Sequence, residues 1–141
     1  WYNGWNWHQR RAVTPIQNAA VRSGELIRPT VCSICGFSDP AHLDGRGYIF
    51  MHLEDYGDPI GGVLPACKRC HYALHARFWK PGLWLGIVRR HGRAGIWFAN
   101  LTMNAADMLR PYGELYPAGV GSTTVPARPT TQRIRNPADR A

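Results

Sequence analysis

Two pairs of cysteines constrain the fold of this chain more than any other feature. Cys32 and Cys35 lie in the segment CSIC, Cys67 and Cys70 lie in CKRC, and 31 residues separate the pairs. Each C-x-x-C turn directs two sulfurs at one ion, so the two turns together supply the four thiolates of a tetrahedral zinc site. Free buried thiols and redox pairs are the alternatives. We expect a structural zinc ion that joins two distant segments and has no open coordination position.

Length and charge limit the class of protein. The chain has 141 residues, of which 45% are hydrophobic, and this suits one domain with a modest core. Its formal net charge is +8, carried by fifteen arginines and only two lysines. Because arginine binds phosphate and guanine edges through two hydrogen bonds, this excess indicates a nucleic-acid partner. A GC-rich genome is the alternative explanation, and acidic partners or anionic membranes are compatible with charge alone.

Targeting signals are not evident. We find no secretory signal peptide, and no apolar run approaches the roughly 18 residues that a membrane helix needs. Paired cysteines without a secretory signal favour metal binding, so we expect a cytoplasmic protein without membrane contact. The chain begins with Trp1 rather than methionine, and we expect that residues precede it.

The local sequence predicts several short elements. Thr14 and Pro15 resemble the cap and first residue of a helix that Gly24 ends, which leaves 1–12 as an aromatic and basic arm. Branched and aromatic residues predict a strand over 46–53. The remaining expectations are an extended piece that becomes a helix near Cys67 within 63–79, a helix over 83–93, an ambiguous segment over 94–101, and a helix within 100–113 that is capped by Asn or Thr and ends at Pro111.

Two histidines follow the second cysteine pair. His71 and His75 are four residues apart, and on a helix this spacing places both imidazoles on one face, where they can reach one ion. The alternative is that they only cover the helix surface. Because the predicted strand carries His52 nearby, we favour a catalytic metal site.

Four segments together carry a resemblance to a known family. They are NGWNWHQRR, GELIRPTVCSICG, HLEDY and CKRCHYALH. In this order and spacing they resemble the zinc-bracketed HNH nucleases, most closely small phage- and bacteria-associated ones. The resemblance runs from about Asn3 to about Phe98 and is specific over 24–78. It implies an α+β fold: a small ββα-metal (HNH) core with a four-cysteine zinc site, an N-terminal helix and a helical or irregular C-terminal extension.

The resemblance also implies an activity and a site. The chain would be a metal-dependent DNA endonuclease inside a bacterial cell, encoded by the bacterium or a phage. His52 would be the general base that activates water, and His71 and His75 would hold Mg²⁺ or another divalent ion. Family members often carry Asp or His before the base as a third ligand, where this chain has Met51. The family's asparagine in the loop before the helix is also missing.

Two carboxylates follow His52 in the sequence. For Glu54 and Asp55 we favour capping of the turn or pairing with a nearby arginine. The alternative is that one of them contacts the ion or orients His52. We expect Tyr56 to pack.

Basic and aromatic residues supply candidate nucleic-acid contacts. The predicted contacts are Lys68, Arg69, Arg77, Arg89, Arg90 and Arg93. Trp5, Trp7, Arg10 and Arg11 form an aromatic and basic cluster that could stack on bases or simply pack. We expect His8, His42 and His91 to be polar surface residues. A homodimer that cuts both strands and a monomeric nickase are both compatible with the sequence.

These predictions divide the chain into four parts. They are an aromatic and basic arm with a helix (1–30), the zinc-bracketed core (31–80), a basic aromatic extension (81–116) and a Pro/Arg-rich tail (117–141). The alternative functions are a zinc-stabilised DNA-binding module with weakened catalysis, and an interaction subunit of a larger nucleic-acid-processing assembly.

Overall fold

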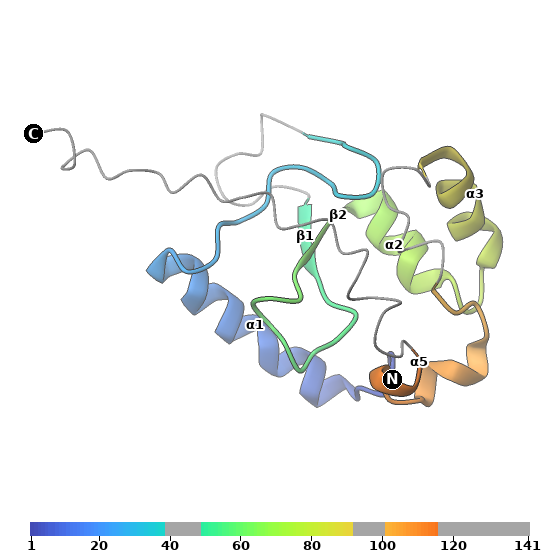
Figure 1. The fold of residues 1–141 in the computed structure, drawn as a ribbon, viewed down its shortest axis with the longest axis horizontal. Coiled ribbons are helices and arrows are strands. Elements are labelled where there is room, and N and C mark those ends of the chain that lie inside the picture. Colours follow the sequence, from blue (N-terminus) through green and yellow to red (C-terminus); the bar gives the residue numbers. More distant parts are fainter. Residues whose placement is uncertain (39–48, 92–100, 116–141) are drawn as a thin grey trace, which may run out of the picture.

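The computed structural model describes residues 1–38, 49–91 and 101–115, and they contain helices and a small two-stranded sheet (Figure 1). The elements are α1 (Trp7–Ser23), β1 (Ile49–His52), β2 (Leu64–Cys67), α2 (Lys68–Ala76), α3 (Pro81–His91), the 3-10 helix η2 (Ala105–Leu109) and α5 (Tyr112–Leu115). The predicted α+β class is therefore confirmed. Within these ranges, none of the helices combines the length and hydropathy needed to cross a lipid bilayer. His42, Arg93, most of the ambiguous segment 94–101 and the tail 117–141 lie outside the described residues.

Helix α1 begins earlier than the sequence predicted. It starts at Trp7, because the Asn6 side chain accepts a hydrogen bond from the backbone N–H of Gln9 and the Gln9 side chain accepts one from that of Asn6. Pro15, predicted as the first helical residue, lies exposed inside the helix. The cap at Thr14 was therefore wrong, whereas the end at Gly24 is confirmed by its left-handed backbone, with φ of 80°.

The sheet and α2 form one continuous unit. β1 and β2 pair antiparallel, with Ile49 opposite Cys67 and His52 opposite Leu64. Helix α2 follows β2 directly, and Cys67 is its N-cap residue. The predicted strand and the predicted change from extended chain to helix near Cys67 are both confirmed. This order places the second cysteine pair where β2 meets α2 and places His52 at the end of β1.

The core lies between this unit and α3. Trp84 and Ile87, three residues apart on α3, are 1% and 3% exposed and belong to one cluster with Ile49, Leu64 and Leu74. Three of the four cysteines, Cys32, Cys67 and Cys70, belong to the same cluster. The cysteine site is therefore part of the core.

The chain after α3 returns to cover the N-terminus. Instead of one helix within 100–113, there is a short 3-10 helix capped by Asn104 and a separate α5 after Pro111. Gly4 has φ of 79°, donates to the carbonyl of Met108 at 3.0 Å, and would place a Cβ atom 2.6 Å from the carbonyl oxygen of Arg110. This close approach accompanies the burial of Tyr2 and Asn3, which lie in the segment predicted as an aromatic and basic arm.

Candidate metal centres

Two turns present the four cysteines to one another. The first turn closes through the Cys32 N–H, which donates to Phe37, and through Gly36, whose φ of 73° lets the chain reverse. Ser33 donates from both its backbone and its hydroxyl to the carbonyl of Pro65, at 2.8 and 2.7 Å. These bonds fix the first turn against β2, beside the second cysteine pair.

The sulfur geometry fits a tetrahedral metal site. The four ligand atoms of Cys32, Cys35, Cys67 and Cys70 lie within 4.8 Å of one another. The sulfurs of Cys35 and Cys67 are 3.7 Å apart, close to the about 3.8 Å that tetrahedral geometry requires for Zn–S bonds of about 2.3 Å. The four cysteines could therefore hold a metal ion such as zinc.

Within the cysteine site, the thiol groups change one another's pKa values. A hydrogen bond with Cys70 is the main cause that lowers the pKa of Cys32 to about 4, and the same bond raises the pKa of Cys70. The Cys32 thiolate therefore forms readily, whereas the raised pKa values of Cys35 and Cys70 oppose their ionisation. A divalent cation would stabilise all four thiolates at once.

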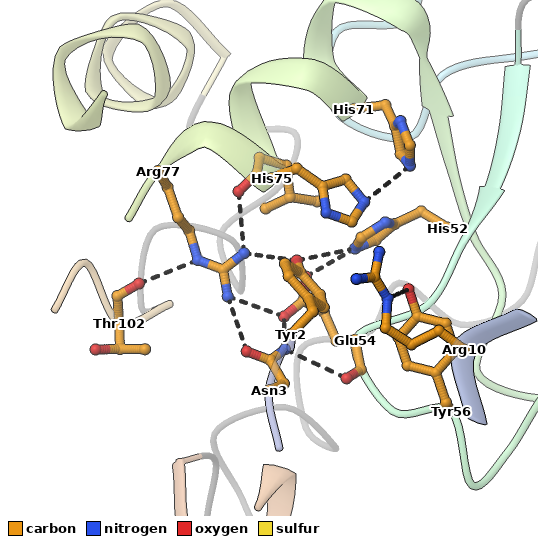
Figure 2. Close-up of polar contacts among 11 residues, drawn as sticks. Tyr2, Asn3, Arg10, His52, Glu54, Tyr56, His71, His75, Arg77 and Thr102 are labelled. Carbon is orange, nitrogen blue, oxygen red and sulfur yellow. Dashed lines mark hydrogen bonds and ion pairs between the residues drawn. The ribbon is translucent and has the colours of Figure 1, made fainter. Parts of the chain in front are cut away.

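Three histidines form a second cluster. His52, His71 and His75 each offer a ligand atom within 4.8 Å of the others. The Nε2 atoms of His71 and His75 are 3.0 Å apart (Figure 2), and ligand nitrogens about 2.1 Å from one ion are about 3.0–3.4 Å apart in octahedral or tetrahedral geometry. The predicted pairing of His71 and His75 on one helix face is therefore present, and His52 joins it.

The environment keeps the helix histidines neutral. Burial first, and then the nearby His52 ring, lower the pKa of His71 to about 4 and that of His75 to about 2. The His71 ring also stacks on Phe50, with ring centres 4.4 Å apart. Since a neutral imidazole is the form that binds a metal ion, both side chains are prepared to act as ligands.

Glu54 defines the orientation of His52. Its Oε1 atom lies 2.7 Å from His52 Nε2, which therefore carries the proton and donates it to the carboxylate. The other ring nitrogen, Nδ1, is buried and has no hydrogen-bond partner among the described residues. The ring lies beside both helix histidines, with centres 5.2 Å from His71 and 4.9 Å from His75 (Figure 2). In the neutral ring with its proton on Nε2, the Nδ1 lone pair is not used by another described group.

A buried network in turn holds Glu54. Asn3 Nδ2 and Arg77 Nη2 contact Glu54 Oε2 at 2.5 and 3.2 Å, and the Tyr2 hydroxyl donates to Oε1 (Figure 2). Burial opposes ionisation of Glu54, but Arg77 and the bonds from His52 and Tyr2 outweigh it and lower its pKa to about 2. Glu54 is therefore a charged carboxylate that is 2% exposed.

Sequence reasoning found part of this network. Pairing of Glu54 with an arginine and capping by Asp55, whose Oδ1 accepts from Gly57 at 2.8 Å, are both confirmed. The structure gives Glu54 the alternative role as well, since it orients His52. The roles of Tyr2 and Asn3 were missed, and the only signal was the NGW segment at the start of the resemblance.

Arg77 does not suit the predicted contact with nucleic acid. Its side chain is 0% exposed, and its guanidinium donates to Tyr2, to Thr102 and to Leu74. We therefore correct its role from a phosphate contact to a buried partner of Glu54. The other described candidates, Lys68 and Arg69 on α2 and Arg89 and Arg90 on α3, are exposed.

Comparison with known proteins adds no assignment. No protein-family model, no curated protein and no solved structure matches the chain significantly.

Proposed function

We propose that this protein is a metal-dependent DNA endonuclease of the HNH type. The cysteine cluster would hold structural zinc, His71 and His75 would hold a second divalent ion, and His52 would be the general base. The proposal is supported by the two clusters, by the β1–β2–α2 order of the elements that carry them, and by the net charge of +8 that favours a polyanionic partner.

The observation that carries the proposal is the state of His52. A general base needs an unprotonated nitrogen near the reacting atoms and a partner that stabilises the cation it becomes. In His52, the Nδ1 atom has no hydrogen-bond partner among the described residues and can serve as the unprotonated nitrogen. Glu54, 2.7 Å from Nε2, is the partner that stabilises the cation. Glu54 thereby supplies the support that the missing asparagine gives in the family.

The histidines and Glu54 would have different roles in phosphodiester hydrolysis. His52 Nδ1 takes a proton from a water molecule that then attacks the phosphorus atom, and Glu54 stabilises the resulting imidazolium. The ion, when bound, stabilises negative charge on the phosphate and the leaving oxygen. His71 and His75 would hold it, and their uncharged imidazoles would favour Mn²⁺, Co²⁺, Ni²⁺ or Zn²⁺ over Mg²⁺. Half-buried Met51, in the third-ligand position, adds no oxygen donor.

A second role for His52 follows from the same distances. Because all three histidines lie within 4.8 Å of one another, His52 Nδ1 could instead be a third ligand in a three-histidine metal site. Metal affinity separates the two roles. Replacement of a base leaves the affinity for the second ion nearly unchanged, whereas replacement of a ligand lowers it strongly.

Replacement of His52 tests the proposal. With added Mn²⁺, we expect His52→Ala to nick supercoiled plasmid at least about a hundredfold more slowly than the parent, which is the low end for loss of a general base. His8→Ala, which removes an exposed histidine of α1, is the control and should keep the parent rate. Equal nicking by the parent and His52→Ala would refute the role of His52. DNA binding by the parent without cleavage in any metal would instead favour the binding module.

A further inference from the structure

A cleft opens beside the histidine cluster. Its volume is about 260 Å³, and it lies between α1 and the end of β1. His52 and His71 line it on one side, with Met51 next to them, and Trp7, Arg10 and Arg11 of α1 line it on the other. The cleft is slightly smaller than the about 300–1,000 Å³ of typical small-molecule pockets, so it suits a short part of a ligand that continues across the surface.

The cleft is positively charged. The described residues that line it include two arginines and no carboxylate. Both arginines come from consecutive positions on α1. A ligand that enters here therefore meets two cations from α1 together with the side chains of His52 and His71.

Aromatic residues hold both arginines in place. The Arg10 Nε atom donates to the Tyr56 hydroxyl at 3.3 Å, and its guanidinium lies 5.4 and 5.6 Å from the ring centres of Tyr2 and Tyr56 (Figure 2). The Arg11 guanidinium lies 4.9 Å from the ring of Trp7. These contacts already restrict both side chains, so less conformational entropy is lost when a ligand binds. They also leave N–H donors of both guanidinium groups for an anion.

We propose that Arg10 and Arg11 bind the phosphodiester backbone of the DNA strand that the site cuts. The inference rests on the proposed function for its substrate class and adds the surface that holds the strand. Arginine donors match phosphate oxygens in geometry and charge. The predicted contacts Lys68, Arg69, Arg89 and Arg90 do not line this cleft, so the main contact with the cut strand lies on α1.

Equilibrium binding to a fluorescent DNA duplex tests the surface. The zinc-loaded full chain is used without added catalytic ion, so cleavage does not interfere. Loss of one phosphate contact should reduce the slope of the logarithm of the association constant against the logarithm of the salt concentration by about 0.9. This corresponds to about eightfold weaker binding near 0.1 M salt. We expect this for Arg11→Gln, whose exposed side chain can change without disturbing the core. Arg10→Gln should show the same loss together with slower cleavage.

Matched variants separate a local contact from general charge. Arg22→Gln removes an exposed arginine from the last turn of the same helix. It should bind within about twofold of the parent, with all melting temperatures unchanged. Equal losses in Arg11→Gln and Arg22→Gln, or no loss in Arg11→Gln, would overturn the inference.

The binding result is independent of the cleavage result. If the parent cleaves DNA and Arg11→Gln binds and cleaves like the parent, the α1 surface is wrong and the endonuclease proposal stands. If no metal supports cleavage but Arg11→Gln alone loses affinity, the endonuclease proposal fails and α1 is still the DNA-binding surface.

Discussion

Removal of metal from the four-cysteine site is expected to unfold the protein. Structural zinc contributes an apparent free energy of about 10–16 kcal/mol in small zinc-dependent folds, against a typical net stability of about 5–15 kcal/mol for a domain. Cys32, Cys67 and Cys70 belong to the main core cluster, so without metal their repelling or protonated sulfurs would sit within it. A chelator should abolish the cooperative thermal transition measured by circular dichroism.

The cysteines allow this prediction to be checked in two ways. Addition of Zn²⁺ after chelation, under reducing conditions, should restore the transition, and metal analysis should find one zinc ion in this site per chain. Cys70→Ser, which changes a residue that is 0% exposed, should behave like the chelated parent. A chelated protein that melts at the parent temperature would show that the site is not structural.

Replacement of Arg77 by methionine should have the second large effect. The change keeps much of the side-chain volume but leaves the Glu54 carboxylate buried without its cation, 3.2 Å from the removed group. Breaking a buried ion pair by removal of one partner costs about 3–5 kcal/mol. Denaturant unfolding of the zinc-loaded protein should show this loss as a lower midpoint with an unchanged slope.

Arg110 offers a matched control for Arg77. Its guanidinium pairs with Asp107 at 2.8 Å, but its side chain is 54% exposed, so water can replace the pair. Arg110→Met should therefore leave the unfolding midpoint close to that of the parent. If Arg77→Met were as stable as Arg110→Met, the buried ion pair would not stabilise the fold.

The sequence predicted those features that depend on local spacing. C-x-x-C turns bring sulfurs together by themselves, and a four-residue interval on a helix aligns His71 with His75, so both clusters were expected. The strand that carries His52 was equally clear from its branched and aromatic residues. These patterns act within one turn or one strand, and tertiary packing did not change them.

Features that depend on particular side-chain hydrogen bonds or on distant contacts were not predicted. Pro15 indicated a helix start, but the reciprocal hydrogen bonds of Asn6 and Gln9 begin α1 at Trp7. Tyr2 and Asn3 lie about fifty residues from Glu54 in the chain and contact it in the fold, beside the place where Gly4 packs closely against Arg110. Burial of Arg77 follows from the same packing, so charge alone suggested a surface role that the fold does not allow.

Plasmid nicking by a variant without the two helix histidines tests the central claim most directly. His71→Ala/His75→Ala should keep one zinc ion per chain and a cooperative melting transition, because the cysteine site is separate. In added Mn²⁺ it should nick supercoiled plasmid at least about a hundredfold more slowly than the parent, a loss of about 2.7 kcal/mol or more in transition-state stabilisation. Cleavage by this variant at the parent rate would contradict the claim that the histidine cluster holds the catalytic ion.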